Sequence, residues 1–203
     1  YHALPPLENS KNQPTGAIKG VISMIKKILI DHPESDLAVV FDAKGKTFRH
    51  DMYTEYKANR PPMPEDLVSQ IDPIHKIIQL MGIKLIMISG VEADDVIGTL
   101  AEQARNKKLD TVISTGDKDM TQLVCKNVSV VNTMTGELLD ESGVKEKFGV
   151  PPEHITDCLA LIGDKADNVP GVDKVGPKTA VKWLDEYTNL ENIIKNAESL
   201  GGK

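Results

Sequence analysis

Acidic residues that could bind metal ions are grouped in four short stretches of the sequence. The stretch GVEADDVIGTL at residues 90–100 places Glu92, Asp94 and Asp95 within four positions, beside an apolar helical pattern. A helix dipole favours acids near its N-terminus, but this explains only one or two, because a third adds repulsion between like charges. The other acids of this kind are Asp42, Asp117, Asp119, Asp164 and Asp167. Carboxylates that converge in such number need cations to stay ionised, and oxygen ligands suit Mg²⁺ or Mn²⁺.

Three of these stretches follow predicted strands. Short apolar runs predict buried strands at residues 37–41, 84–89, 111–115 and 128–132. Asp42 directly follows the first run, and the stretches GVEADD and GDKD follow the second and the third. Helical patterns alternate with the strands, beginning with a helix for which Thr15 is the predicted N-cap, and this alternation predicts parallel pairing. Because ligands bind outside the carboxyl ends of parallel strands, we expect the acids to converge there.

Eight carboxylates are more than one metal ion needs. Two ions about 4 Å apart would stabilise the attacking and leaving oxygens of a phosphoryl group, and this arrangement fits the number of ligands. Zinc is disfavoured, because the sequence lacks the paired Cys and His spacing that binds it. We therefore expect two Mg²⁺ or Mn²⁺ ions and phosphoryl chemistry.

The overall composition is compatible with a nucleic-acid partner. The formal net charge of the 203 residues is −6, but eight acids belong to the expected metal site, so the remaining surface is slightly basic. No stretch approaches the roughly 20 apolar residues that a membrane span requires. Cys125 and Cys158 form no metal or disulfide pattern and are predicted to be reduced thiols of a cytoplasmic protein.

The segment 42–66 has a composition that suits single-stranded nucleic acid. Its cations are Lys44, Lys46, Arg49, His50, Lys57 and Arg60, and its aromatic residues are Phe48, Tyr53 and Tyr56. Cations interleaved with aromatic rings favour phosphate contacts and base stacking, whereas the alternative is an ordinary solvated loop. The position directly after Asp42 favours the first interpretation. Few apolar anchors and several like charges predict that the segment is mobile without DNA.

The stretch VPGVDKVGPKTAVKWL at residues 169–184 predicts a glycine-rich turn followed by a helix with Pro177 at its first position. Glycines allow close backbone approach, and the amides at a helix start bind phosphate oxygens. Lys174 and Lys178 add positive charge. An ordinary corner between two helices is the alternative. The pattern favours contact with a phosphate backbone without reading of bases.

Longer motifs resemble a known family. They are VFDAKGKTFR, YKANRPPMP, SGVEADDVIGTLA, STGDKDMTQLV, FGVPPEHITDCLALIGDKADNVPGV and VGPKTA. In this order they closely resemble the 5′-nuclease domains at the N-terminus of bacterial DNA polymerase I, which are members of the flap endonuclease superfamily. The resemblance covers nearly the whole chain.

The resemblance implies an α/β fold. It has a PIN-like nuclease core over residues 1–147, with an arch over residues 42–66, and a helix–three-turn–helix DNA-binding region over residues 148–203. It also implies a structure-specific 5′ nuclease, a 5′-3′ exonuclease or 5′-flap endonuclease that acts on flaps, nicks or RNA primers in replication and repair. The hairpin 171–176 of such proteins commonly holds K⁺.

The motifs also assign roles to residues. The first metal group includes Asp42, Glu92, Asp94 and Asp95, and the second includes Asp117, Asp119, Asp164 and Asp167. Lys57 and Arg60 match the catalytic residues of the arch that approach the scissile phosphate. The expected DNA contacts are Lys44, Lys46, Arg49, Tyr56, Gly171, Lys174, Val175, Gly176, Lys178 and Thr179.

Two departures from the family pattern leave alternatives open. The family begins with a strand that carries a further metal-site Asp, and this strand is absent before the Tyr-His that opens the chain. The chain also stops at ESLGGK, within the expected DNA-binding region, so we expect a fragment truncated at both ends. A DNA-binding module that does not cleave is therefore one alternative, and fusion to a polymerase in a longer chain stays open. A phosphatase-like hydrolase is a third interpretation, which the second phosphate-binding segment at 169–184 disfavours.

Overall fold

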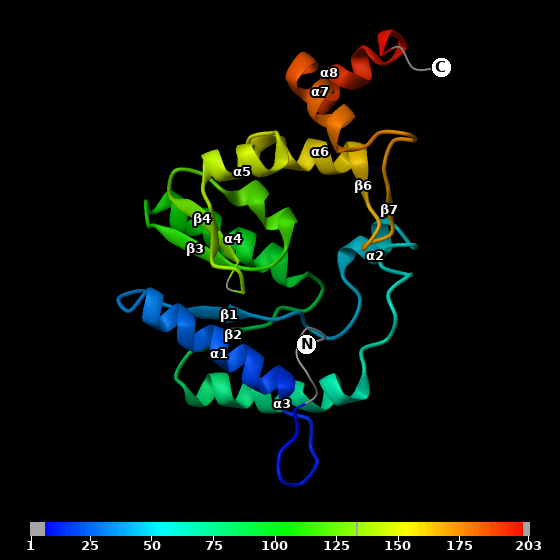
Figure 1. The fold of residues 1–203 in the computed structure, drawn as a ribbon. Coiled ribbons are helices and arrows are strands. Elements are labelled where there is room, and N and C mark those ends of the chain that lie inside the picture. Colours follow the sequence, from blue (N-terminus) through cyan, green and yellow to red (C-terminus); the bar gives the residue numbers. More distant parts are fainter. Residues whose placement is uncertain (1–6, 133, 201–203) are drawn as a thin grey trace. The chain divides into compact units, whose positions relative to one another are not determined.

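The computed structural model describes residues 7–132 and 134–200 and has an α/β fold (Figure 1). The chain forms two compact units. The first contains the residues up to Thr47 together with Pro61–Val96, and the second contains Phe48–Arg60 together with the residues from Ile97 onward. None of the helices in the described ranges is long and apolar enough to cross a membrane.

The first unit pairs two strands and packs two long helices. Strands β1 (Ala38–Val40) and β2 (Lys84–Ile86) are parallel, with Val39 opposite Leu85. Helices α1 (Gly16–Asp31) and α3 (Glu65–Leu80) contact each other and supply the buried residues of this core. These buried residues are Ala17, Ile25, Ile74 and Ile78. The strands predicted at 37–41 and 84–89 are confirmed, although both are shorter than the apolar runs.

The start of α1 is capped by a side chain from α3. Thr15 occupies the predicted N-cap position, but its hydroxyl donates to the carbonyl of Leu7 at 3.2 Å and makes no cap. Instead, Oε1 of Gln70 accepts hydrogen bonds from the N–H groups of Ala17 at 2.8 Å and Ile18 at 3.2 Å. Gln70 is only 1% exposed. The side-chain amide of Gln70 thus satisfies N–H groups that a helix start leaves open. The predicted N-cap position of Thr15 is confirmed, but its side chain does not cap the helix.

The second unit contains a three-stranded sheet in the order β3-β4-β5. Strands β3 (Thr111–Ser114) and β4 (Val128–Asn132) are parallel, as predicted, and the 3₁₀ helix η1 (Lys118–Leu123) lies between them in the sequence. Strand β5 (Glu137–Leu139) pairs antiparallel with β4 and was not predicted. Helix α4 (Ala93–Asn106) has its first turn in the first unit and the rest in the second.

Helices dominate the remainder of the second unit. In chain order the elements are α2 (Phe48–Met52), α5 (Glu141–Phe148), η2 (Pro152–His154), α6 (Ile155–Ile162), β6 (Gly163–Asp164), β7 (Val169–Pro170), α7 (Pro177–Tyr187), α8 (Leu190–Lys195) and η3 (Ala197–Ser199). Helix α7 packs against both α6 and α8. Residues of the sheet and of these helices form one core, which includes Ile113, Val130, Val144, Leu161 and Leu184. The small antiparallel hairpin β6–β7 lies between α6 and α7 and was not predicted.

Candidate functional site

The acids of the first unit gather at the N-terminus of α4. Asp42 follows β1, and its Oδ1 accepts a hydrogen bond from the N–H of Ala93 at 2.7 Å. Asp95 folds back so that its Oδ2 accepts from the N–H of Glu92 at 2.9 Å. Glu92 itself is 8% exposed. Two of the predicted metal ligands, Asp42 and Asp95, therefore also cap this helix, because its open donors and its dipole favour carboxylates.

Asp117 and Asp119 lie at the start of η1 in the second unit. Oδ1 of Asp117 accepts from the N–H of Asp119 at 2.9 Å. The Oδ1 atom of Asp119 is buried and has no hydrogen-bond partner among the described residues. Burial and then the charge of Asp117 raise the pKa of Asp119 to about 6, with smaller contributions from Asp164 and Asp167. The four acids of this unit therefore share one electrostatic environment.

Asp164 shapes the loop of the β6–β7 hairpin. Its Oδ1 accepts from the N–H groups of Ala166 at 2.7 Å and Asp167 at 3.3 Å, and its Oδ2 lies 3.2 Å from Nζ of Lys118. Burial acts to raise the pKa of Asp164, but the hydrogen bonds from Ala166 and Lys118 outweigh it and hold the pKa below its ordinary value. Asp164 is therefore ionised and already paired with a lysine.

Asp167 brings together the two predicted catalytic cations. Arg60 makes an ion pair and hydrogen bond with its Oδ1, and Nζ of Lys57 lies 3.7 Å from its Oδ2. The Tyr56 hydroxyl also donates to Oδ2 at 3.0 Å. These residues lie in the turn that follows α2, beside the β6–β7 hairpin (Figure 1). The structure thus joins a predicted metal ligand to the residues predicted to act on the phosphate.

The other predicted DNA contacts of the segment 42–66 are divided between the two units. Lys44 and Lys46 are exposed on the first unit, between β1 and α2. On the second unit, the guanidinium of Arg49 lies 4.6 Å from the centroid of the Phe48 ring. Residues 55–60 have few apolar anchors, as expected, since Tyr56 is the buried side chain among them, but polar bonds of Glu55 and Asn59 hold them to the hairpin. The mobility of the segment stays a prediction.

A metal role for the acids stays a prediction. Within residues 7–132 and 134–200, no three Asp, Glu, His or Cys side chains are grouped so that together they could hold an ion. In the second unit, Asp164 faces Lys118, and Asp167 faces Lys57 and Arg60. The donor chemistry nevertheless fits a hard divalent ion, since every predicted ligand there is a carboxylate and the buried Oδ1 of Asp119 lacks a donor.

Gly171 has a structural role that its predicted DNA contact did not anticipate. A Cβ on this residue would lie 2.2 Å from the backbone carbon and oxygen of Ile162. Gly163 faces it with φ +78, and a Cβ there would lie 2.3 Å from the nitrogen of Gly171. The two glycines let the chain returning from the hairpin pass directly against the end of α6.

The start of α7 presents the other residues that were predicted to contact DNA. Gly176 occupies the N-cap position, no side chain caps the helix, and Pro177 is its first residue, as predicted. Lys178 is exposed, and the ammonium of Lys174 lies 4.0 Å from the carboxylate of Asp173. Val175 packs against the core and Thr179 is half-buried, so these two support the turn more than they face solvent. The exposed helix start and its lysines suit a phosphate group.

Two family models together match the whole chain. The N-terminal resolvase-like domain of 5′-3′ exonucleases matches residues 1–149, and their C-terminal SAM fold matches residues 150–203. The chain belongs to the 5′-3′ exonuclease family. The resemblance to the nuclease region of bacterial DNA polymerase I is thereby confirmed. The predicted domain boundary between residues 147 and 148 stays a prediction, since the compact units divide the chain elsewhere.

Curated relatives of this exonuclease family member include DNA polymerase I proteins and shorter 5′-3′ exonucleases. DNA polymerase I of Pseudomonas aeruginosa is 58% identical over all of the chain, which spans 24% of that protein. A 5′-3′ exonuclease of Aquifex aeolicus is 48% identical over 98% of the chain, which spans 68% of that protein. The chain therefore spans about a quarter of the first relative and about two thirds of the second.

A solved structure agrees with the fold. The T5 D15 protein, co-crystallised with metal ions, matches with a TM-score of 0.77 and 25% identity, over 87% of this chain and 71% of that one. The α/β architecture expected from the resemblance is therefore confirmed.

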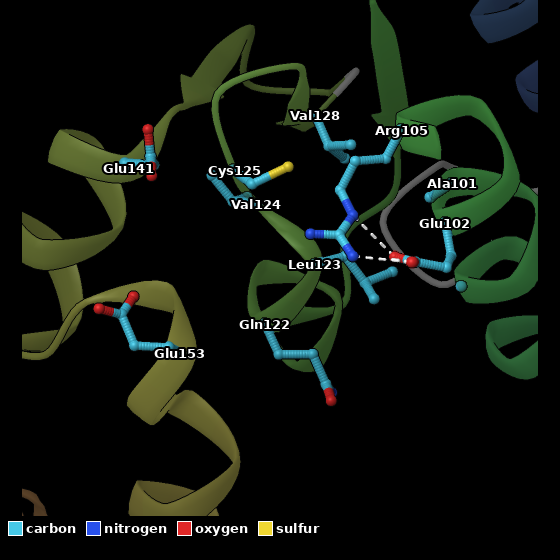
Figure 2. Close-up of a pocket in the computed structure, with 11 residues that line it drawn as sticks. Ala101, Glu102, Arg105, Gln122, Leu123, Val124, Cys125, Val128, Glu141 and Glu153 are labelled. Atoms are coloured by element: carbon cyan, nitrogen blue, oxygen red, sulfur yellow. Dashed lines mark hydrogen bonds and ion pairs between the residues drawn. The ribbon is translucent and has the colours of Figure 1, made fainter. Parts of the chain in front are cut away.

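A cavity of about 340 Å³ in the second unit contains none of the predicted site residues. Arg105 extends across it and makes two hydrogen bonds with Glu102, while Glu141 and Glu153 lie on the opposite side (Figure 2). Three carboxylates against one arginine, which is already paired, make this cavity unsuitable for a polyanion.

Sequence reasoning missed several residues that organise the site of this exonuclease family member. Lys118 was passed over within the GDKD stretch, and Asn59 and Asn168 within the motifs of the resemblance. No local pattern indicates their partners, which lie 46 to 113 positions away along the chain.

Proposed function

We propose that this chain is the 5′-nuclease part of a DNA polymerase I, and that it hydrolyses DNA phosphodiesters at 5′ flaps, nicks or RNA primers. The observation that carries the proposal is the meeting of Lys57 and Arg60 with the acidic hairpin at Asp167. Membership of the 5′-3′ exonuclease family and the 58% identity with a DNA polymerase I support it. The free thiols Cys125 and Cys158 agree with work in the reducing cytoplasm.

The acids would hold two divalent ions, Mg²⁺ or Mn²⁺, with one group in each unit. The ligands would be Asp42, Glu92, Asp94 and Asp95 in the first group, and Asp117, Asp119, Asp164 and Asp167 in the second. Such ions supply a nucleophilic water and stabilise the charge on the attacking and leaving oxygens. The T5 D15 protein, which was co-crystallised with metal ions, supports the binding of metal ions.

The chain's own cations would act on the phosphate. Lys57 and Arg60 can turn from Asp167 toward the scissile phosphate, where developing negative charge binds them more tightly than in the ground state. Lys44, Lys46, Arg49 and Tyr56 would contact the strand that carries the 5′ end.

The start of α7 would bind the duplex next to the cut. Its open amides, with Lys174 and Lys178, offer contacts to phosphates and none to base edges, so the recognition would depend on DNA structure rather than sequence. Gly171, Val175, Gly176 and Thr179 would shape this contact, and the carbonyls of the turn 171–176 are the proposed position for K⁺.

A labelled 5′-flap duplex tests the proposal directly. The protein with Mg²⁺ should release a shortened labelled strand, and EDTA or the substitution Asp94→Ala should abolish this release while the fold persists. Binding without cleavage would instead identify a DNA-binding module, and a duplex that is neither bound nor cut would overturn the proposal.

A further inference from the structure

Two segments far apart in the sequence are joined by hydrogen bonds, in which the side-chain amide of an asparagine in each segment donates to a backbone carbonyl in the other. Nδ2 of Asn168 donates to the carbonyl of Glu55 at 2.7 Å, and Nδ2 of Asn59 donates to the carbonyl of Lys165 at 2.9 Å. The N–H of Lys57 donates to the carbonyl of Asp167 at 2.9 Å. We call residues 55–60 and 165–168, joined in this way, the clasp.

The backbone of the clasp adopts an uncommon conformation on both sides. Lys57 has φ +57 and Asn168 has φ +59, in the left-handed region that residues other than glycine seldom adopt. Such conformations persist where the surroundings hold the residue in place, and they cluster at functional sites. Here each left-handed residue belongs to a segment that bonds to the other.

Polar bonds rather than apolar packing hold the clasp. Of its described residues only Tyr56 is buried. A hollow of about 390 Å³ lies alongside, lined by Tyr53, Asn59, Lys165, Asn168, Val169 and Pro170. Because so little side-chain surface is packed between the segments, loss of an amide donor should loosen them.

From this geometry we infer that Asn168 and Asn59 are positioning residues for Lys57 and Arg60. The inference rests on the proposed function, in which these two cations act on the phosphate. Asn168 holds the residue two positions before Lys57, and Asn59 directly precedes Arg60. The asparagines therefore fix the backbone positions of Lys57 and Arg60, and in this role they do not contact the substrate.

The substitution Asn168→Gly separates the effect of the lost side-chain hydrogen bond from the effect of the left-handed backbone conformation. Glycine keeps the left-handed conformation without strain but removes the amide donor. Asn12 provides a matched control, because it also has φ +57 and lies in the first unit, so Asn12→Gly should behave as the wild type. Asn59→Ala is a second variant at an exposed position where the fold should persist.

Trypsin cleavage after Lys57 reports the clasp without any nuclease assay. Asn168→Gly and Asn59→Ala should each raise the initial rate of this cleavage, by on the order of tenfold, since the opened segment becomes accessible to the protease. Cleavage after Lys11 in the first unit should not change. An unchanged rate after Lys57 in both variants would overturn the inference.

Flap cleavage supplies the second measurement. Both variants should lower kcat by on the order of tenfold with little change in KM, because misplaced groups lose alignment rather than affinity. In the double variant, Asn168→Gly should not lower kcat below that of Lys57→Ala alone. Additive effects on kcat, or an unchanged kcat in the single variants, would contradict a positioning role. If the wild type cuts no DNA, the proposed function fails, while the trypsin result still decides whether the clasp exists.

Discussion

Nζ of Lys118 lies 3.2 Å from Oδ2 of Asp164, so a cation of the protein sits beside a predicted metal ligand. The charge of Lys118 also acts to lower the pKa of the neighbouring Asp119. An ammonium group can therefore supply part of the positive charge that this acidic cluster requires.

Removal of that ammonium should strengthen divalent-ion binding. Lys118→Ala should tighten binding of Mn²⁺ roughly threefold, since an exposed ion pair contributes about 0.2–1 kcal/mol. Titration calorimetry with Mn²⁺ measures the change. Lys126→Ala, at an exposed position of the same unit, is the control and should have no effect. Weaker Mn²⁺ binding by the Lys118 variant would show that the lysine supports the ion site rather than competing with it.

Asp119 should make the metal-free protein less stable as the pH rises. Burial and the charge of Asp117 raise its pKa from 3.8 to about 6. The folded state then holds the proton more tightly than the unfolded chain, so this stabilisation is complete below pH 3.8 and is lost as the pH rises through about 6.

The substitution Asp119→Asn should flatten the pH dependence of the urea midpoint between these two values. Asp173→Asn, whose side chain is 90% exposed, should leave it unchanged. A pH dependence equal to that of the wild type would mean that Asp119 ionises as readily in the folded protein as in the unfolded chain.

Gly171→Ala should destabilise the protein, because its Cβ would meet the Ile162 backbone at 2.2 Å. Overpacking of this kind costs about 1–3 kcal/mol or more. Gly116→Ala is the matched control, since its Cβ would meet nothing within 4 Å. Urea unfolding of the two variants gives the comparison. Equal stability would show that the hairpin and the end of α6 can move apart at little cost.

Lys57 and Lys178 should have different effects on DNA cleavage. Lys57→Ala should lower the rate at saturating flap DNA more than it lowers affinity, because its cation acts where charge develops. Lys178→Ala should weaken binding equally for all sequences and reduce the salt dependence by about one phosphate contact. Single-turnover rates and binding titrations at several salt concentrations separate the two. If saturating DNA restores full turnover to Lys57→Ala, that lysine only binds the substrate.

The strands that the sequence predicted correctly are those with apolar and β-branched residues grouped together. Residues 37–41 and 111–115 are rich in β-branched side chains, which buried strands favour. Strand β5 was missed because it has only two leucines, of which Leu138 is 60% exposed. The N-cap position of Thr15 was predicted correctly, but the side chain that caps α1 was not, since Gln70 lies 53 positions from Ala17. Local patterns carry no information about such distant partners.

The position of acids directly after strands indicated which residues belong to the candidate site. It did not indicate which side chains there make ion pairs with one another. Asp42 was expected beside the start of α4, and the structure places it there. The ion pair of Arg60 with Asp167 joins residues 107 positions apart, and only tertiary packing creates it. The polar bonds that hold Glu55 and Asn59 to the hairpin could not be predicted for the same reason.

The carboxylate of Asp167 accepts hydrogen bonds from Tyr56 and Arg60 and makes an ion pair with Lys57. Any cation that Asp167 binds must compete with these donors, so its binding and the docking of residues 55–60 are thermodynamically linked. Linkage is reciprocal: the factor by which docking weakens the cation's affinity is also the factor by which the cation loosens the docked segment. Whether the clasp is closed would then depend on which cation Asp167 binds. Lys57 and Arg60 would leave Asp167 for the phosphate only when another positive charge takes their place beside it.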